Sequence, residues 1–433
     1  MFVKFVWKPA LVLGVAASLV ASTQQPATRP VAHLGNLSAY GPGWSTAHAD
    51  ARNSDYSPVR GARNLTQAWQ RSFSGSIYLG ATNDAAGRAY VTTNGTGCHL
   101  HALDMATGNT VWCSSEVDER AIASSALLDQ EGHAYLADGE AMHSFDADGS
   151  LRWETPIVGT PLSAQFTPAG NLIFITHIGR VYVLDRATGQ PVLPPVELIP
   201  GAPDNDDTRA CMRGTAECPA ANTLAVDLAT GRFFFTFWDK GAPSAGIRAM
   251  QLDEGAAPAI RPLWTVESLP GGSATSPDLS VDGSRVYVGD NEGGIHALDT
   301  ATGAEIWSHS TGYAAGGSPS LSPEGLIMPS GGGDGALMAI KDMGDRAQQV
   351  WKKDGLTNRG IPTQAAGGVA YATVSTALGN DLVVVDTATG AELDRERIPG
   401  LTIFSVGTTV GPDGTVLVPS ITGDLVAYRP AQG

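Results

Sequence analysis

Three aspartates stand close together near the middle of the 433-residue chain, in the stretch DNDDTRACMRGTAEC. Asp204, Asp206 and Asp207 could bind a calcium ion, because carboxylate oxygens are the hard ligands that this ion prefers. Their spacing differs from the twelve-residue loop of dedicated calcium sites, and a solvated acidic loop is the competing interpretation. The sequence therefore names three candidate metal ligands without fixing a site.

Histidines provide two further candidates for chemistry. His99 and His101 alternate along a predicted strand, so both side chains point the same way and could chelate a metal. His48 and Asp50 could carry out acid–base chemistry, but the sequence does not single out a serine nucleophile. It contains no Gly-x-Ser-x-Gly, Walker-type or zinc-protease motif. Histidines that only satisfy structural hydrogen bonds are the alternative.

Four cysteines in an exported chain predict two disulfide bonds. Cys98 and Cys113 flank two predicted strands, and folding these strands into an antiparallel hairpin brings the two residues opposite each other. Cys211 and Cys218 close a short loop. Neither pair has the spacing of a metal or haem site, so both pairs are predicted to be structural. The first bond is expected to contribute roughly 3 kcal/mol of stability.

The N-terminus predicts export. Residues 1–22 contain two lysines, an apolar run from Ala10 to Ala21 and small residues at its end, as in a secretory signal peptide. The apolar run is short for a bilayer span, and no other run approaches spanning length. We therefore expect a secreted or periplasmic protein with no transmembrane segment after signal cleavage, and an uncleaved anchor is the alternative.

The composition is that of a globular, turn-rich chain. It contains 52 glycines and 27 prolines, and 42% of its residues are hydrophobic. The net charge of −16 argues against a nucleic-acid partner, because phosphates would be repelled. We expect a monomer whose acidity mainly serves solubility.

A repeated phrase indicates the elements that must position these residues. LHALDMATGNTVW at 100–112 recurs as IHALDTATGAEIW at 295–307, with looser copies at 181–193 and 382–394. Most corresponding positions are separated by 39 to 46 residues, and one step is 68 residues long. These positions are Asp104, Asp146, Asp185, Asp253, Asp299, Asp342, Asp386 and Arg429. Repeats of about 43 residues are typical of four-stranded propeller blades.

Each part of the phrase has a structural reason. The aspartate accepts hydrogen bonds from the following turn, and the glycine supplies the positive φ that the turn needs. The tryptophan on the last strand is expected to fill the wedge between neighbouring blades, where its ring buries on the order of 150–250 Å².

Eight such positions predict an all-β, eight-bladed β-propeller of four-stranded repeats over residues 65–433, after a lead-in segment at 23–64. The last unit stops before its own outer strand, whereas Trp69 stands one period ahead of Trp112. An N-terminal strand is therefore expected to pair with the strand around Val426 in the C-terminal blade and to close the ring.

The units resemble the PQQ-like repeats of quinoprotein alcohol dehydrogenase-like propellers, a superfamily that also includes the propeller lipoprotein of the outer-membrane β-barrel assembly machinery. The similarity covers almost all of residues 65–433. Residues 44–69 also resemble the segment that opens quinoprotein alcohol dehydrogenases. The matching residues are Trp44, Asn53, Tyr56-Ser57-Pro58, Asn64-Leu65 and Ala68-Trp69.

The resemblance implies two cofactors to be tested, pyrroloquinoline quinone (PQQ) and calcium. Residues 227–246 are similar to the family segment in which a strand ends at a calcium-binding Asn followed by Pro, so Trp238 and Asp239 become candidate cofactor-binding residues. A simple turn residue is the alternative for Asp239. The chain departs from the family's enzymes because it has no adjacent cysteine pair and no matching Glu in its first blade.

An insertion at 194–222 accounts for the long step between Asp185 and Asp253, and such insertions usually lie on one face as binding loops. Complete repeats without the cofactor residues favour a non-catalytic module that binds a protein or a glycan through face loops. A PQQ-dependent oxidoreductase acting on alcohols or sugars is the first alternative. A hydrolase or lyase with carboxylates or histidines around the central channel is the second.

Overall fold

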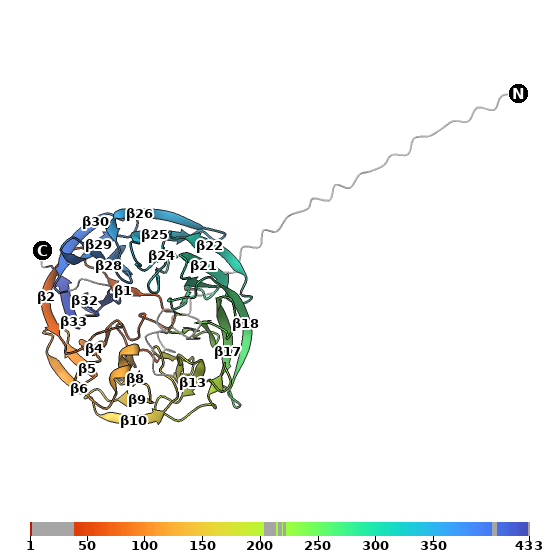
Figure 1. Cartoon of the computed structure of the whole chain (residues 1–433), viewed down its shortest axis with the longest axis horizontal. Helices are drawn as coiled ribbons and strands as arrows, with labels where there is room; N and C mark the ends of the chain where they lie inside the picture. Colours follow the sequence, from red (N-terminus) through yellow and green to blue (C-terminus); the bar gives the residue numbers. More distant parts are fainter. Residues whose placement is uncertain (2–38, 203–213, 215–218, 220–221, 401–404, 432–433) are drawn as a thin grey trace. The chain divides into compact units, whose positions relative to one another are not determined.

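Eight β-sheets stand around one central axis in the computed structural model of the chain (Figure 1). The predicted all-β, eight-bladed propeller is therefore confirmed. The structure describes Met1 and residues 39–202, 214, 219, 222–400 and 405–431. The signal peptide predicted at 1–22 lies outside the described residues, as do Asp204, Asp206, Asp207, Cys211 and Cys218.

The first four blades each contain four strands that follow one another in chain order from the axis to the rim (Figure 1). Blade 1 consists of β3 (Thr82–Asn83), β4 (Arg88–Thr92), β5 (Leu100–Asp104) and β6 (Thr110–Ser114). Blade 2 consists of β7 (Leu127–Leu128), β8 (Ala134–Ala137), β9 (Ala141–Phe145) and β10 (Leu151–Pro156). Blade 3 consists of β11 (Gln165–Phe166), β12 (Leu172–Ile175), β13 (Arg180–Leu184) and β14 (Val196–Glu197). Blade 4 consists of β15 (Ala225–Asp227), β16 (Arg232–Phe237), β17 (Ala245–Asp253) and β18 (Ala259–Leu269).

The last four blades include two strands from the start of the chain. Blade 5 consists of β19 (Asp278–Leu279), β20 (Arg285–Gly289), β21 (Gly294–Asp299) and β22 (Glu305–Ser310). Blade 6 consists of β23 (Ser320–Leu321), β24 (Leu326–Met328), β25 (Ala336–Asp342) and β26 (Ala347–Thr357). Blade 7 consists of β27 (Thr363–Ala366), β28 (Val369–Thr376), β29 (Gly379–Asp386) and β30 (Glu392–Ile398), with β1 (Tyr56–Arg60) added in parallel at its inner edge. Blade 8 consists of β31 (Thr409–Val410), β32 (Val416–Pro419), β33 (Asp424–Pro430) and β2 (Leu65–Ser72).

The two ends of the described chain meet in blade 8. β2 pairs antiparallel with β33, so that Trp69 lies opposite Ala427 and Gln70 lies opposite Val426. The outer strand of the last blade therefore comes from the start of the chain, and this pairing leaves the ring without an unpaired seam at that blade.

Tryptophans and glycines of the repeated phrase join neighbouring blades. A Cβ at Gly108 of blade 1 would lie 2.7 Å from the ring of Trp69, and the same relation holds between Gly149 and Trp112 in the next pair of blades. The indole N–H of Trp69 also donates to the carbonyl of Met105, at 2.8 Å. The glycine is therefore required for two reasons, its positive φ and the flat ring that packs where a side chain would stand.

The hydrophobic core lies between the blades. Phe233 of blade 4 packs in one cluster with Ile173 of blade 3, whereas the next residue, Phe234, packs in another with Val286 of blade 5. Alternate residues of a strand point to opposite faces of its sheet, so each blade contributes to two such clusters. This packing gives the ring a rigid frame for the loops at its two ends.

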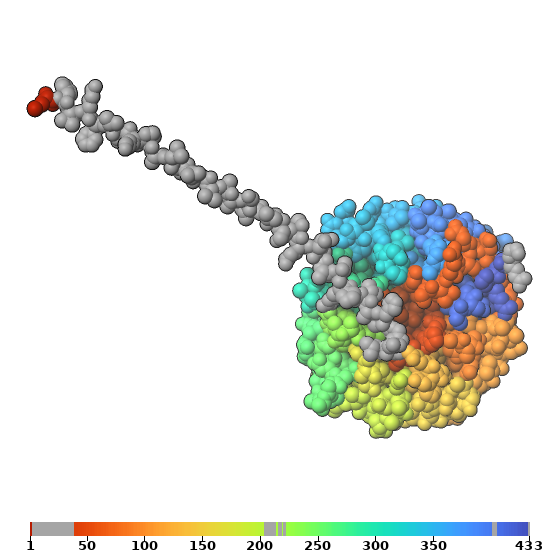
Figure 2. All heavy atoms as spheres, turned by 180° about the vertical axis from the view of Figure 1, so that it is seen from behind, coloured from red at the N-terminus to blue at the C-terminus, as the bar shows by residue number. Residues whose placement is uncertain are grey.

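The described residues of the lead-in occupy the centre of the ring, where they are orange-red in Figure 2. We call residues 39–60 the hub. Backbone carbonyls of the hub accept hydrogen bonds from N–H groups at the innermost strands of six blades. The pairs are Trp44 with Asn83, Ser45 with Leu128, Ala51 with Val226, Arg52 with Leu279, Ser54 with Leu321 and Asp55 with Gln364, at 2.7 to 3.1 Å.

Candidate functional site

Consecutive strands of a blade run antiparallel, so the connections alternate between two faces of the ring. The turns after the first and third strands lie on one face. The loop after the second strand and the loop to the next blade lie on the other. We call this second face the insertion face, because most of the predicted insertion at 194–222 belongs to the connection from β14 of blade 3 to β15 of blade 4.

A cleft of about 430 Å³ opens on the insertion face where the loop that joins blades 1 and 2 meets the loop between β8 and β9. The first of these loops contains η2 (Glu119–Ala123), a short 3₁₀-helix that Asp118 caps by accepting a hydrogen bond from the Arg120 N–H, at 2.7 Å. Six of the lining residues are carboxylates: Glu116, Asp118, Glu119, Asp138, Glu140 and Glu154. We call this feature the acidic cleft.

Asp138 is the most constrained carboxylate of the acidic cleft. Its Oδ1 accepts the N–H groups of Glu140 and Ala141, at 2.8 and 2.9 Å, and its Oδ2 accepts that of Asp118, at 3.0 Å. His143 contacts the same Oδ2 through Nε2, at 3.0 Å. Burial alone would raise the pKa of Asp138, but these hydrogen bonds hold it well below its usual range. Asp138 therefore stays ionised.

His143 lies at the inner wall of the acidic cleft with one ring nitrogen unused. Because Asp138 is ionised, Nε2 of His143 donates to it. The side chain is 3% exposed, and the buried Nδ1 has no hydrogen-bond partner among the described residues. A buried polar atom without a partner costs roughly 1–3 kcal/mol.

The described surroundings leave the acidic cleft with an excess of negative charge. Arg120 is held beside it by Asp118, through Nε at 2.9 Å, and by Glu140, through Nη2 at 3.1 Å. A Cβ at Gly139 would overlap the Arg120 guanidinium, so the glycine lets this side chain lie flat on the loop. One guanidinium cannot neutralise six carboxylates, and the cleft therefore attracts cations.

The first predicted disulfide is present. Cys98 and Cys113 are bonded to each other across the hairpin of β5 and β6 in blade 1. Cys98 lies just before β5, and Cys113 lies within β6, opposite His101. Nothing in the described residues bears on the second predicted pair. The three predicted metal ligands of the insertion also stay a prediction, since they lie outside the described residues.

Trp238 and Asp239 lie at the end of β16, on the insertion face of blade 4. The Asp239 carboxylate forms an ion pair with Arg248, whose guanidinium carbon lies 4.0 Å from the centre of the Phe237 ring. Trp238 donates its indole N–H to the carbonyl of Ala242, at 3.0 Å. Because Asp239 already has a cation as its partner, these residues as arranged do not fit a calcium ion that would hold PQQ. Their assignment to a cofactor stays a prediction.

The two histidines of blade 1 have different surroundings. His99 lines the acidic cleft, and its Nδ1 lies 3.0 Å from the carbonyl oxygen of Thr93. His101 packs against Phe73, and its Nε2 lies 3.3 Å from the Thr93 hydroxyl. Burial and the charge of Arg71 lower the pKa of His101 to about 4. His101 is therefore neutral at physiological pH.

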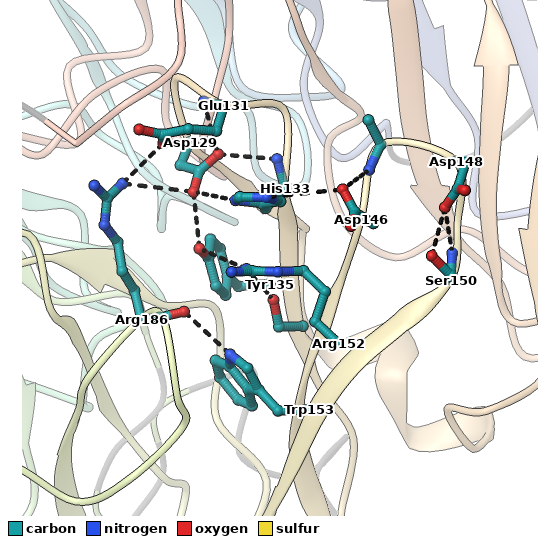
Figure 3. A network of polar contacts seen from close by, with 12 residues as sticks. Asp129, Glu131, His133, Tyr135, Asp146, Asp148, Ser150, Arg152, Trp153 and Arg186 are labelled. Atoms are coloured by element: carbon teal, nitrogen blue, oxygen red, sulfur yellow. Dashed lines mark hydrogen bonds and ion pairs between the residues drawn. The ribbon is translucent and has the colours of Figure 1, made fainter.

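A group of three potential metal ligands within the described ranges lies on the opposite face, in the turn between β7 and β8 (Figure 3). Its residues are Asp129, Glu131 and His133. Arg186 of blade 3 points into the group and donates to Asp129 and Glu131, at 3.5 and 3.2 Å. The guanidinium stands where a metal ion would, so the network joins two blades rather than forming a metal site.

The sequence does not reveal the acidic cleft, because the residues of the cleft come from two blades and from loops between the repeated phrases. One signal was available. An Asp-x-Glu pattern stands shortly before the histidine of the repeat in ADGEAMH and in GDNEGGIH. Both aspartates bind their histidines, Asp138 in blade 2 and Asp290 in blade 5.

The fold and its interblade contacts define a class, the repeat propellers in which a tryptophan of one unit packs on a glycine turn of the next, as at Gly108, Gly149, Gly189, Gly303 and Gly390. A family model described as outer membrane protein assembly factor BamB matches residues 66–236 and 247–402. The chain belongs to this family of PQQ-like propellers. No helix in the described part of the chain has the length and apolar character needed to cross a membrane.

One relative in sequence and two in structure illustrate the similarity. Protein Rv3035 of Mycobacterium tuberculosis is 33% identical over 400 residues, which cover 90% of this chain and 96% of the relative. Quinohemoprotein alcohol dehydrogenase from Comamonas testosteroni superposes with a TM-score of 0.65 at 15% identity, over 92% of this chain and 83% of that one. BamB from Moraxella catarrhalis gives a TM-score of 0.59 at 17% identity, over 84% and 97%. At these identities the two structures show the fold alone.

Proposed function

We propose that this protein is an exported binding module that captures a cationic segment of a partner protein in the acidic cleft. The observation that carries the proposal is the cleft itself, in which six carboxylates line a volume of about 430 Å³. A lysine or arginine side chain supplies both the charge and the N–H donors that these groups lack.

The charge of the acidic cleft selects among the ligand classes that the sequence leaves open. Anions such as nucleic acid or a quinone with several carboxylates are repelled by it, and a neutral glycan gains nothing from it. A basic protein segment gains both attraction during encounter and hydrogen bonds when bound. Among partners of the insertion face, a protein is therefore favoured over a glycan.

Two observations support export and an interaction role. The predicted signal peptide at 1–22 and the Cys98–Cys113 bond fit an oxidising compartment, either the periplasm or the exterior. The family description names an assembly factor, a role that depends on contacts with other proteins. No quinone chemistry is needed for such a role.

The test measures binding of a fluorescent oligo-arginine peptide by anisotropy at two salt concentrations. The variant Glu119→Gln/Glu154→Gln removes two exposed carboxylates of the acidic cleft and is expected to weaken binding about tenfold, at roughly 0.7 kcal/mol for each charge. The control Asp345→Asn removes an exposed carboxylate in the turn between β25 and β26, on the opposite face, and should leave binding unchanged.

Two results would overturn the proposal. One is equal affinity of the double variant and the unaltered protein for the peptide. The other is a neutral oligosaccharide that binds while the cationic peptide does not, which would move the function to the glycan class. Raising the salt concentration should weaken the expected complex, because exposed charges are screened.

A further inference from the structure

The hub places His48 between a carboxylate and a hydroxyl group that the sequence does not connect. Its Nδ1 lies 2.8 Å from Oδ2 of Asp55, seven residues further along the hub. Its Nε2 lies 3.0 Å from Oγ of Ser276, which lies two residues before the inner strand of blade 5. This is the order of groups in a nucleophilic triad, with the imidazole between a serine and an aspartate.

The partner of His48 differs from the one considered in the sequence. Asp50 donates its backbone N–H to the His48 carbonyl, at 2.9 Å, but its carboxylate binds Arg52 through Nη2, at 2.6 Å. Asp55 instead faces the imidazole and is 5% exposed as a side chain. Burial raises the pKa of the Asp55 carboxyl, and its contact with His48 opposes that rise. The prediction of acid–base groups near residue 48 thus found the histidine but paired it with the wrong carboxylate.

The hub holds these groups in a backbone that L-amino acids rarely adopt. In the part of the chain that the structure describes, four residues other than glycine have a positive φ: Ala49, Asn53, Asp55 and Ser163. Three of them lie in the hub, and Asp55 is itself a member of the triad arrangement. Such conformations cost of order 1–3 kcal/mol each and cluster at functional sites.

Asn53 shows how the fold maintains this strain. Its side-chain amide donates to the carbonyls of Thr223 and Pro277, at 3.2 and 3.0 Å, and its Oδ1 accepts the amide of Gln165, at 2.8 Å. The hub is therefore fixed to blades 3, 4 and 5 at Asn53, five residues after His48. A merely connecting segment would not need strained residues secured in this way.

Ser276 is one of three serines whose hydroxyl groups accept a backbone N–H group from a neighbouring blade. Comparing the three serines distinguishes a structural role from a chemical role. The Ser125 N–H donates to Ser163 Oγ, and the Ser276 N–H donates to Ser318 Oγ, at 3.0 and 2.9 Å. Ser276 Oγ likewise accepts the Thr223 N–H, at 3.2 Å. Of these three described serine acceptors, Ser276 is the one whose hydroxyl also faces an imidazole.

We propose that Ser276, His48 and Asp55 form a nucleophilic triad that hydrolyses small, uncharged acyl esters. Burial limits the size of the substrate, because Ser276 is 2% exposed and His48 provides the open edge of the site, with 12% of its side chain accessible. Burial also disfavours an anionic ester, because a charge that leaves water loses its hydration. The same burial raises the pKa of the Asp55 and Asp278 carboxyls in this region. This activity goes beyond ligand capture at the acidic cleft and does not depend on it.

The reaction uses only the ester and water. Ser276 Oγ attacks the acyl carbon while His48 Nε2 takes the hydroxyl proton, and His48 then gives that proton to the departing alkoxide, which leaves as the alcohol. Water attacks the resulting acyl-serine, His48 takes one proton from it, and the carboxylic acid leaves as that proton returns to Oγ. Asp55 is a positioning residue, because it accepts a hydrogen bond from the Nδ1–H group and fixes the tautomer that leaves Nε2 free to act as the base.

The first test needs no variant. Mature protein is treated with diisopropyl fluorophosphate and digested, and the modified serine is located by mass spectrometry. A single adduct on Ser276 is the expected result. The proposal is overturned if the adduct sits on another residue, or if none forms under conditions that fully modify a known serine hydrolase.

Kinetics with p-nitrophenyl acetate then test the roles of the groups. Ser276→Ala should lower the rate at least 10³-fold, whereas the matched variant Ser318→Ala should keep it within about threefold. Asp55→Asn should lower kcat with KM unchanged, and Asp55→Glu should restore part of the loss. Equal rates for the Ser276 and Ser318 variants, at equal melting temperatures, would assign both serines to structure and refute the triad.

Discussion

Blades 2 and 5 carry a histidine at the same position of the repeat and use it differently. His143 and His296 each stand three residues before the aspartate of the repeated phrase, and each binds the aspartate that follows the second strand of its blade. In blade 5 a second carboxylate, Glu305, lies 2.8 Å from His296 Nδ1. In blade 2 the described residues supply no such partner, and the acidic cleft opens there instead.

Blade 1 provides a third member of the series. His101 occupies the same position, but Thr93 replaces the loop aspartate, and its hydroxyl lies 3.3 Å from Nε2. Burial and Arg71 lower the pKa of His101 to about 4, whereas two carboxylates raise that of His296. The repeat thus fixes where the imidazole stands, and one or two neighbouring residues decide whether it faces a hydroxyl group, one carboxylate or two carboxylates.

The largest effect expected from this comparison is a difference in stability between two histidine variants. His296→Leu should lower the free energy of unfolding by about 2–3 kcal/mol, because Asp290 and Glu305 both lose their partner. His143→Leu should cost about 1 kcal/mol or less, because Asp138 keeps three backbone donors and an unsatisfied nitrogen is removed. Urea unfolding followed by tryptophan fluorescence measures both. Equal losses of unfolding free energy in the two variants would show that the unpartnered Nδ1 of His143 has no energetic consequence.

The pH dependence of stability should report on the ion pairs of His296 in blade 5. Burial alone would lower the pKa of His296, but Asp290 and Glu305 raise it above its ordinary value. Its contribution is therefore complete below about pH 6.5 and is lost as pH rises through the folded-state pKa, with a limit of about 1.4 kcal/mol for each pKa unit. The difference in unfolding free energy between the unaltered protein and His296→Gln should shrink from pH 6 to pH 9. A difference that grows over this range would contradict the assignment.

A smaller effect is expected when blade 5 is converted to the arrangement of blade 2. Glu305→Ala leaves His296 Nδ1 without its acceptor and should cost about 0.5–1.5 kcal/mol. Glu154→Ala is the matched control, since Glu154 lies across from His143 on β10 and is exposed. Its effect on stability should stay within about 0.5 kcal/mol, although it should weaken binding of the cationic peptide. A larger loss from Glu154→Ala would mean that the cleft carboxylates serve the fold.

The parts of the molecule that repeat were predictable from the sequence, and the parts that depend on unique long-range contacts were not. The Asp104, Thr107 and Gly108 turn and its contact with Trp69 follow from local turn chemistry and from the period. The central position of the hub could not be predicted, because the hub binds the blades through backbone carbonyls. Every residue type has such a carbonyl, so these contacts leave no pattern in the sequence. Likewise, Ser276 is separated from His48 by 228 residues, and no local signal marks it among many serines.

Blade 4 extends the comparison to a loop in which adding a ligand is expected to have the smallest effect on stability. Asp239 follows the second strand of its blade, as Asp138 does in blade 2, but its partner is Arg248 rather than a histidine. An ion pair within the blade leaves this carboxylate with little to gain from a calcium ion, so PQQ and calcium together should not shift the melting temperature. A ligand present at a hundred times its dissociation constant would add about 2.7 kcal/mol, which differential scanning fluorimetry detects readily. Arg248→Gln frees Asp239 and serves as the sensitised control. A shift in the unaltered protein, accompanied by dye reduction with alcohols, would restore the quinoprotein alternative and place redox chemistry on the face here assigned to binding.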